Sequence, residues 1–534
     1  MLLNGDLQLA GGYLINPRFE NLAVDPVGTA GRVYFNQNVA GLRVYDGSVW
    51  ANEGAISTAL TIYVRAAGND TTGDGSTSGT AYATINRAIQ DLQGRCIDAA
   101  VLIDIKETAS FAGFDLQGIP VGPNGSLTIE GNYTSFGGSG TVLNSQSTFA
   151  NCNVILKDLY ANTGAANAFV LNHGAVVQSD GIVEVDTSAV GILCENSRYT
   201  ALTELRVGQT SSPTFGIQVD KNSVFTIQDN LQVRVPTDKT GIQVINGSCF
   251  YGEDDSTTIT ITHNGGITGW VGFWVNEFSS ANIQQDLNFT GPGVANTVGF
   301  VVKRSRAFLL CDITISDVTN ALDVQYGSYL EQSGDLSLTS IGAYGVKVSM
   351  GSYYRAGLGS LTVTTPGSMK MFYGYSASCI EVGISSTATI PFSSSGYFIQ
   401  LDSSQGNFTF SGRVQGPGTL SSIFLYIINR ASCSFSSLRV NQYDGFAHVA
   451  QQSTLTWGGQ VIQNGSGTSS LPLFGHSRGG TSIYLTGGTG YQGPAGSNCT
   501  ITISNSTVSA YSSFNFSPAD GTFPGNVSHG NFAT

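Results

Sequence analysis

The sequence predicts an all-β protein whose chain winds into a parallel β-solenoid, and two observations carry this prediction. The first is composition, because 11% of the residues are charged, 41% are hydrophobic, and 68 of the 534 residues are glycine. Few stretches combine the leucine, alanine, glutamate and lysine that favour helices. The second is a short motif that recurs at intervals of 22 to 31 residues through the middle of the chain. A repeat of this length is typical of stacked solenoid coils.

The repeated motif is a small residue, an apolar residue, any residue and a valine-like residue, followed by a polar turn and usually a serine. In one clear copy, Gly216-Ile217-Gln218-Val219 leads to Ser223. Weaker copies begin at Gly396 and Leu425. The stronger copies begin at Gly191, Gly216, Gly241, Gly272, Gly299, Ala321 and Gly345.

The second and fourth positions of each copy place two apolar side chains on one face of a short strand. A unit of about 25 residues cannot bury that face alone, so each coil must stack on its neighbour. We therefore expect one inward ladder of Ile217, Ile242, Phe273 and Phe300, and another of Val219, Val244, Val275 and Val302. A β-sandwich array would also be rich in glycine and short strands, but a motif in fixed phase favours the solenoid.

The first coil needs a cap, because an open solenoid end exposes unpaired strand edges. One amphipathic helix is expected there, since Ile85, Ala88, Ile89 and Leu92 share one helical face and Thr84 can cap its N-terminus. A turn-rich run, GNDTTGDGSTSG, precedes this helix. Its segment Asp70–Gly75 loosely resembles the start of a calcium loop but lacks the glutamate that such a loop requires, so we expect a turn.

The segment IYVRAAGNDTTGDGSTSGTAYATINRAIQDL, which starts at Ile62, resembles the first coil of right-handed parallel β-helix proteins of the pectate-lyase-like superfamily, particularly bacteriophage tailspikes. The upstream stretches Gly31–Asn36 and Gly41–Trp50 resemble a small module of phage tail-fibre and tailspike proteins. The resemblance implies a homotrimer with a right-handed β-helix shaft. It also implies attachment to other phage tail proteins through the N-terminal module, and a C-terminal cap that supports trimer assembly.

These features divide the chain into four parts. Residues 1–57 form the virion-attachment module and linker, and 58–110 form the start of the β-helix with its capping helix. Residues 111–490 form the shaft, and 491–534 form a C-terminal β cap at the trimer tip. The strands expected in this cap are Thr500–Ser504 and Ser512–Phe516.

Charge and patterning exclude several classes of function. A net charge of −13 argues against nucleic-acid binding, and no apolar run approaches the roughly 18 residues of a membrane span. The first residues lack the basic region of a signal peptide, so we expect synthesis in the host cytoplasm and a working location on the virion. Eight widely spaced cysteines and five scattered histidines show no metal-ligand spacing, so reduced thiols and no metal or cofactor are expected.

Two groups of acidic residues are candidates for function. Glu195 and Asp220 follow the valine-like position of adjacent copies. Stacking would place their carboxyl groups roughly 5 Å apart, a separation that suits the catalytic pair of a retaining glycosidase. A solvated column of charges is the alternative.

The second group is Glu253, Asp254 and Asp255, in an expected turn, with Trp270 and Trp274 in the next copy. Carboxylates accept hydrogen bonds from sugar hydroxyls, and indole rings stack on sugar faces, so these five residues are candidate glycan contacts. The alternative is a solvated turn with tryptophans in the core or at a subunit interface.

We therefore expect a phage tail appendage, either a tailspike or a tail fibre, that binds a host surface polysaccharide or lipopolysaccharide. One alternative is a depolymerase on the same β-helix, acting as a glycoside hydrolase or lyase, and another is a structural baseplate or collar protein. Cys249, Cys379 and Cys433 each follow the recurring serine. By strand alternation we expect all three thiols to point outward, where a trimer interface would cover them.

Overall fold

The computed structural model describes most of residues 50–462 and several short strand segments outside that range. The gaps within that range are residues 210–212, 236–238, 264–268, 365–368, 387–388, 393–395, 416–422 and 442–444. The outlying segments are 21–22, 32–36, 41–45, 474–475, 481–485, 490–493, 506–510, 515–518 and 532–533.

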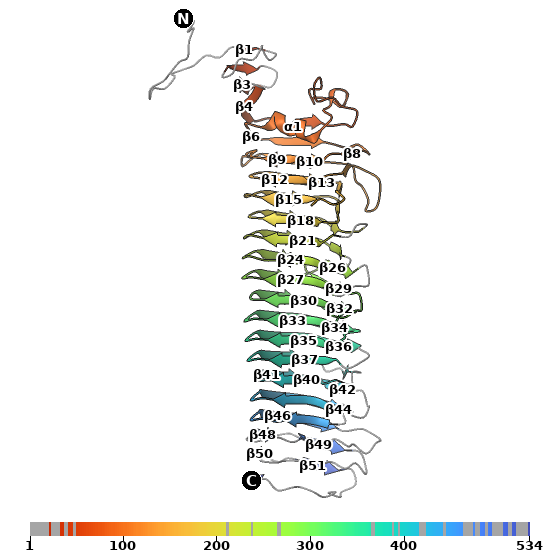
Figure 1. Ribbon diagram of the computed structural model, residues 1–534, viewed down its shortest axis with the longest axis vertical. Helices are drawn as coiled ribbons and strands as arrows, with labels where there is room; N and C mark the ends of the chain where they lie inside the picture. The colour runs from red at the N-terminus through yellow and green to blue at the C-terminus, as the bar shows by residue number, and fades with distance from the viewer. Residues whose placement is uncertain are drawn as a thin grey trace, which may run out of the picture.

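The predicted parallel β-solenoid is confirmed, with about 12 turns stacked along one axis (Figure 1). A representative coil contains β24 (Thr240–Val244), β25 (Cys249–Gly252) and β26 (Thr258–His263). Each strand pairs in parallel with its counterpart in the next coil, namely β27 (Val271–Asn276), β28 (Ser280–Ile283) and β29 (Asp286–Thr290). The shaft therefore has three faces, which we number in chain order.

The first face is a 15-stranded sheet. Besides β24 and β27 it contains β9 (Asp115–Gln117), β12 (Ser147–Ala150), β15 (Phe169–Asn172), β18 (Val190–Glu195), β21 (Phe215–Asp220), β30 (Val298–Lys303), β33 (Asn320–Gln325), β35 (Tyr344–Ser349), β37 (Lys370–Tyr375), β40 (Ile399–Asp402), β43 (Ile423–Ile428), β45 (Gly445–Val449) and β47 (Phe474–Gly475).

The second face carries β25 and β28 in the middle of the shaft. Its other strands are β5 (Leu60–Tyr63), β7 (Ala100–Asp104), β10 (Ser126–Glu130), β13 (Asn153–Lys157), β16 (Val176–Ser179), β19 (Arg198–Ala201), β22 (Val224–Ile227), β31 (Arg306–Leu310), β34 (Tyr329–Thr339), β36 (Tyr353–Thr364), β38 (Cys379–Ile384), β41 (Gln405–Phe410), β44 (Ser432–Asn441), β46 (Thr454–Ile462), β48 (Thr481–Leu485), β50 (Ser506–Ala510) and β52 (Phe532–Ala533).

The third face carries β26 and β29, and the long strands β34, β36, β44 and β46 extend onto it. Its other strands are β8 (Ser110–Phe111), β11 (Val142–Leu143), β14 (Leu159–Asn162), β17 (Val183–Asp186), β20 (Leu205–Val207), β23 (Leu231–Val235), β32 (Ile313–Ser316), β39 (Thr389–Pro391), β42 (Arg413–Gln415), β49 (Gly490–Gly493) and β51 (Asn515–Pro518).

Both predicted inward ladders are present. Ile217, Ile242, Phe273 and Phe300 are consecutive register partners, and so are Val219, Val244, Val275 and Val302. All eight side chains are fully buried. Aromatic rings reinforce the core, as between Phe273 and Phe300, whose centroids lie 5.0 Å apart in a stacked arrangement.

The recurring serine forms a second kind of ladder at the corner between the first and second faces, which we call the first corner. The backbone N–H of Ser223 donates to Oγ of Ser248 at 3.1 Å, and the N–H of Ser248 donates to Oγ of Ser279 at 3.3 Å. The same bond continues through Ser305, Ser328 and Ser352. These serines are buried, so the ladder satisfies backbone groups that the sharp turn leaves outside the sheets.

The N-terminal cap also forms as predicted. Helix α1 (Ile85–Leu92) buries Ile85, Ala88, Ile89 and Leu92, and Oγ1 of Thr84 accepts from the N–H of Arg87. The preceding run is a turn, in which Oδ1 of Asp70 accepts from the N–H groups of Ala83 and Thr84. A short 3-10 helix, Ser78–Thr80, lies within it.

A separate five-stranded sheet adjoins this cap. It contains β1 (Asn21–Leu22), β2 (Val33–Asn36), β3 (Gly41–Tyr45), β4 (Trp50–Ile56) and β6 (Arg95–Ile97). The rest of the predicted attachment module lies outside the described residues. Among those that are described, no helix is long and apolar enough to cross a bilayer.

The weaker repeat copies are shifted from their predicted phase. Ile399, expected at the fourth motif position, pairs with Phe372 and Leu425 in the ladder of second positions. Phe398 therefore stands where other coils have glycine. The next turn places Ala431 at the serine position, and Ser432 falls one residue later.

This shift overturns one cysteine prediction. Cys249 and Cys379 occupy outward positions and are half-buried, but Cys433 pairs with Gly406 and Leu455 in an inward column and is 3% exposed. Burial raises the pKa of its thiol well above the usual value. Cys433 is therefore a core residue, and the expectation of three equivalent outward thiols is wrong.

Strand pairing continues beyond residue 490. The described strands β50 and β51 pair in parallel with β48 and β49, so they extend the sheets of the shaft. The predicted strand Thr500–Ser504 lies outside the described residues, and the predicted strand Ser512–Phe516 overlaps β51 at its end.

Candidate functional site

The structure brings Glu195 and Asp220 together as direct register partners on the first face. Nζ of Lys221 lies 2.7 Å from Oε1 of Glu195, and this hydrogen bond raises the pKa of the lysine. Oδ1 of Asp220 accepts from Nδ2 of Asn246 and from the N–H of Lys221, both at 2.6 Å. Both carboxylates thus act as acceptors in a network that fixes the first corner. Their catalytic role stays a prediction.

The second predicted group is not assembled into one site. Glu253, Asp254 and Asp255 form the turn between β25 and β26, where the second face meets the third. Oγ and N–H of Ser256 donate to Oδ1 of Asp254 and lower the pKa of that carboxyl. Trp274 points outward from the first face, away from this turn.

The prediction that Trp270 contacts a glycan is wrong. Its side chain is fully buried, with its ring edge-on to His263 at a centroid distance of 5.9 Å. A sugar on the outside of the shaft cannot stack on this ring, so Trp270 is a core residue. Among the described residues there is also no cluster of three or more side chains that could hold a metal ion.

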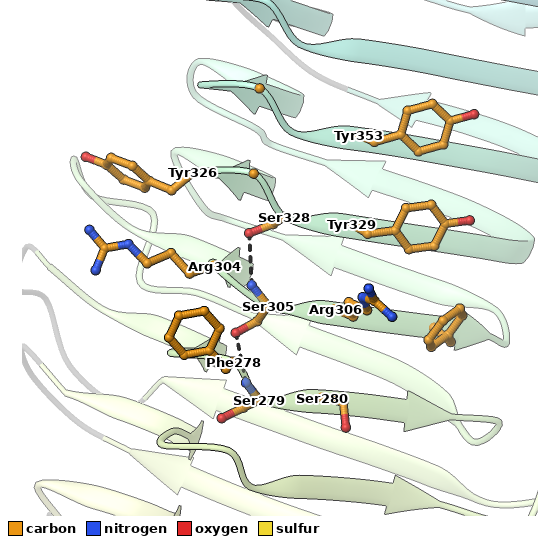
Figure 2. Close-up of a pocket in the computed structure, with 13 residues that line it drawn as sticks. Phe278, Ser279, Ser280, Arg304, Ser305, Arg306, Tyr326, Ser328, Tyr329 and Tyr353 are labelled. Atoms are coloured by element: carbon orange, nitrogen blue, oxygen red, sulfur yellow. Dashed lines mark hydrogen bonds between the residues drawn. The ribbon is translucent and has the colours of Figure 1, made fainter.

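A groove that the sequence analysis missed runs along the first corner, from the coil of β27 to that of β36. Its volume is about 900 Å³. It is lined by Phe278, Ser279, Ser280, Arg304, Ser305, Arg306, Phe308, Tyr326, Gly327, Ser328, Tyr329, Gly351 and Tyr353. Figure 2 shows two walls of side chains on either side of a floor of backbone and serines.

The corner wall consists of Phe278, Arg304 and Tyr326, which project outward from successive turns (Figure 2). Their φ angles are 64°, 51° and 58°, in the left-handed region that bulky residues avoid. Phe278 occupies the turn position that is Gly247 in the preceding coil, yet its side chain is 85% exposed. Phe278 thus combines a left-handed backbone conformation with a side chain that is almost wholly open to solvent.

The strand wall consists of outward aromatic side chains from β31, β34 and β36. The rings of Phe308 and Tyr329 lie 5.8 Å apart, and those of Tyr329 and Tyr353 stack at 5.5 Å with planes 6° apart. The hydroxyl of Tyr329 donates to Oε2 of Glu331 at 2.7 Å, and that of Tyr353 donates to Glu381. Partial burial, followed by these hydrogen bonds, raises the pKa of both tyrosines.

The groove floor is part of the serine ladder. The N–H of Ser279 donates to Oγ of Ser305 at 3.2 Å, and the N–H of Ser305 donates to Oγ of Ser328 at 3.3 Å. Because all three serines are buried and bonded, the floor holds the two walls at a fixed spacing. A rigid groove loses little conformational entropy when it binds a ligand.

A smaller groove of about 350 Å³ adjoins the strand wall on the second face. Its charged residues are Glu331, Arg355 and Glu381, which are consecutive register partners in three coils. Nη1 of Arg355 lies 3.6 Å from Oε1 of Glu331. The surface thus passes from aromatic to acidic across the outward side of β34 and β36.

We compared the chain with protein families, with curated proteins and with solved structures. No protein-family model, curated protein or solved structure matches the chain. The fold and the groove alone define the class, which is a parallel β-solenoid with an aromatic groove along one corner. The sequence did contain one signal for the groove, because phenylalanine replaces glycine in the turn of a repeat.

Proposed function

We propose that the groove along the first corner binds an oligosaccharide, and that the chain is the glycan-binding part of a phage tail appendage. The exposure of Phe278 in a left-handed turn is the observation that carries the binding role. A free apolar ring of this kind gains most from a ligand with an apolar face.

The groove has the chemistry that sugar rings require. Tyr329 and Tyr353 present a stacked aromatic surface, and Tyr326 belongs to the other wall. Sugar rings place apolar C–H faces on such surfaces while their hydroxyls bond to polar groups at the rim. The groove crosses several coils, so it suits a segment of a polymer rather than a single sugar.

The assignment to a phage rests on the resemblance of the segment from Ile62 to Leu92 and of the module upstream. In this proposal the polymer is a host cell-surface polysaccharide or lipopolysaccharide, the shaft assembles as a homotrimer, and residues 1–57 attach it to other tail proteins. Adsorption tests the role directly, because the purified chain should block phage adsorption to the host. An unaffected adsorption rate would favour a structural baseplate or collar protein.

The binding role is tested by the Phe278→Gly variant against polysaccharide from the host envelope. Glycine removes the exposed ring and suits the left-handed backbone, so binding should fall without loss of folding. Leu310→Ala is the matched control, since Leu310 is also an exposed apolar side chain but does not line the groove. Equal binding by both variants would contradict the assignment of the groove.

Glycan hydrolysis is a second candidate function, favoured by Glu331 and Glu381 in the adjoining groove. They lie two coils apart with Arg355 between them, so their Cα atoms are about 10 Å apart by the strand spacing of parallel sheets. In inverting glycosidases the carboxyl groups themselves lie roughly 6.5–9.5 Å apart, so the two glutamate side chains would have to lean towards each other past Arg355 to reach that separation.

Release of reducing ends from host polysaccharide tests this activity. Glu331→Gln and Glu381→Gln should each abolish release if these two groups carry out hydrolysis, while Asp220→Asn should abolish it if the predicted Glu195–Asp220 pair does so. Absence of any release by the unmodified chain would leave glycan binding as its function.

A further inference from the structure

The groove differs in charge from the rest of the chain. Acidic residues outnumber basic ones by 36 to 23 in the whole sequence, but the groove lining contains Arg304 and Arg306 and no carboxylate. Both arginines are exposed, and neither forms a salt bridge with a described residue. Arg304 contacts the face of Tyr326, with its guanidinium 5.6 Å from the ring centroid.

The carboxylates on the adjoining turn and strands are engaged with other partners or lie outside the groove. Glu331 accepts from Tyr329 and pairs with Arg355, and Glu381 accepts from Tyr353. Glu277 precedes Phe278 on the corner but does not line the groove. The two guanidinium groups are therefore available to an anion from outside the chain.

The charge of the binding surface therefore changes from one side to the other. The groove itself carries Arg304, Arg306 and the stacked tyrosines, and the smaller groove beside its strand wall carries Glu331 and Glu381 with Arg355 between them. Guanidinium groups form strong, charge-assisted hydrogen bonds with carboxylates and phosphates. A second anion in the adjoining groove would meet a net negative charge, because Glu331 and Glu381 outnumber Arg355 there.

We propose that the ligand is a heteropolysaccharide whose anionic groups are separated by neutral sugars. A carboxylate or phosphate binds Arg304 on the corner wall or Arg306 on the strand wall, neutral sugars stack on Tyr329 and Tyr353, and hydroxyls bond to Glu331 and Glu381 in the adjoining groove. This inference rests on the proposed function, since it names the substrate class of the same groove. It excludes both neutral glycans and polymers with a charge on every sugar.

The experiment measures binding of the full chain to a panel of purified bacterial surface polysaccharides. The panel holds three classes: neutral polymers, polymers with one anionic group per repeating unit, and polymers with an anionic group on every sugar. The test variant is the double substitution Arg304→Gln and Arg306→Gln. The matched control is Arg198→Gln, because Arg198 is an exposed arginine in the same outward column as Arg306, four coils away.

Binding should concentrate in the class with one anionic group per repeat, and the double variant should lose at least tenfold in affinity for it. Added salt should weaken binding of the unmodified chain and of Arg198→Gln, and should have little effect on the double variant. Preferential binding of neutral or fully charged polymers would overturn the inference, as would equal affinities of the double variant and the control.

Chemical treatment of the tightest ligand separates the two sources of negative charge. Reduction of carboxyl groups to alcohols should abolish the arginine-dependent binding if the anion is a uronic acid, and removal of phosphate should abolish it if the anion is a phosphate ester. Persistence of full binding after both treatments would overturn the inference. Failure to bind any polymer would instead overturn the proposed function itself.

Discussion

The first corner of the shaft has two stretches that share a backbone and differ in their side chains. Around β18 to β24, its turns carry polar residues, and the side chains of Lys221 and Asn246 donate to the carboxylates of Glu195 and Asp220. Around β27 to β36, the equivalent turns carry Phe278, Arg304, Tyr326 and Met350, which project into solvent. Both stretches rest on the same serine ladder and the same inward columns. The difference indicates that the repeat fixes the scaffold, while the turn residues are free to acquire a function.

The largest effect is expected from breaking the scaffold on which both stretches depend. Val244→Asp would bury an unpaired charge in the inward ladder and should cost about 3–5 kcal/mol of unfolding free energy. Urea unfolding followed by far-ultraviolet circular dichroism measures this loss. The control is Gln218→Asp, on an outward and half-buried position of the neighbouring coil. Equal stability of the two variants would contradict the inward column.

The serine ladder should contribute equally to both stretches. Ser223→Ala and Ser305→Ala each remove the acceptor of a buried backbone N–H, so each should cost about 1–3 kcal/mol. The measurement is the urea midpoint of each variant. If only Ser305→Ala were destabilised, the two stretches would not share the scaffold, and the comparison would fail.

Exchanging a residue between the turns of the two stretches separates the cost of a bulky side chain in a left-handed turn from the role of the ring. Gly247→Phe places a bulky residue at a φ of 76°, where its Cβ would lie 2.6 Å from Oδ1 of Asn222, so it should cost about 1–2 kcal/mol or more. Phe278→Gly relieves the same strain, which offsets the greater chain entropy of glycine, so its stability should stay within about 1 kcal/mol of the original.

Calorimetry measures the change in unfolding free energy of Gly247→Phe and of Phe278→Gly. A large loss of stability in Phe278→Gly would show that this ring supports the fold or an assembly of subunits. The chain's oligomeric state, measured by light scattering, would then separate those two explanations.

The smallest expected effect concerns Asp323, on the first face beside the groove. Burial raises the pKa of this carboxyl, and the nearby Lys347, whose Nζ lies 3.3 Å from Oδ2, opposes the shift without cancelling it. The folded state therefore binds the proton more tightly than the unfolded state. Stability should increase as the pH falls through the raised pKa towards 3.8, the usual pKa of an aspartate, and Asp323→Asn should flatten this dependence. A slope unchanged by the substitution would contradict this account.

The sequence was sufficient to predict the central coils and the cap. In those coils an apolar pair and a serine recur in one phase, and in α1 four apolar residues share one helical face. Prediction failed towards the C-terminal end of the shaft, because Phe398 replaces the glycine and Ala431 replaces the serine that mark the phase. Without those markers, Cys433 was placed on the wrong side of its strand.

The groove was not predicted, because its shape depends on turn length and on contacts between coils. The turn of Arg304 is one residue shorter than the neighbouring turns, which end at Ser279 and Ser328. Residues that are far apart in sequence, such as Phe278 and Tyr353, line one groove only after the coils stack. Residue type and sequence spacing point to the acidic candidates, such as Glu195 and Asp220. Neither property shows which side chains already have hydrogen-bond partners in the folded chain.

A crystal structure of the chain with an oligosaccharide from the host envelope would test most directly whether the groove along the first corner binds glycan. We expect sugar density along the first corner, in contact with Phe278 and stacked on Tyr329, with an anionic group at Arg304 or Arg306. Sugar bound at the Glu195–Asp220 pair or on the face of Trp274, or a groove filled by a second copy of the chain, would contradict it.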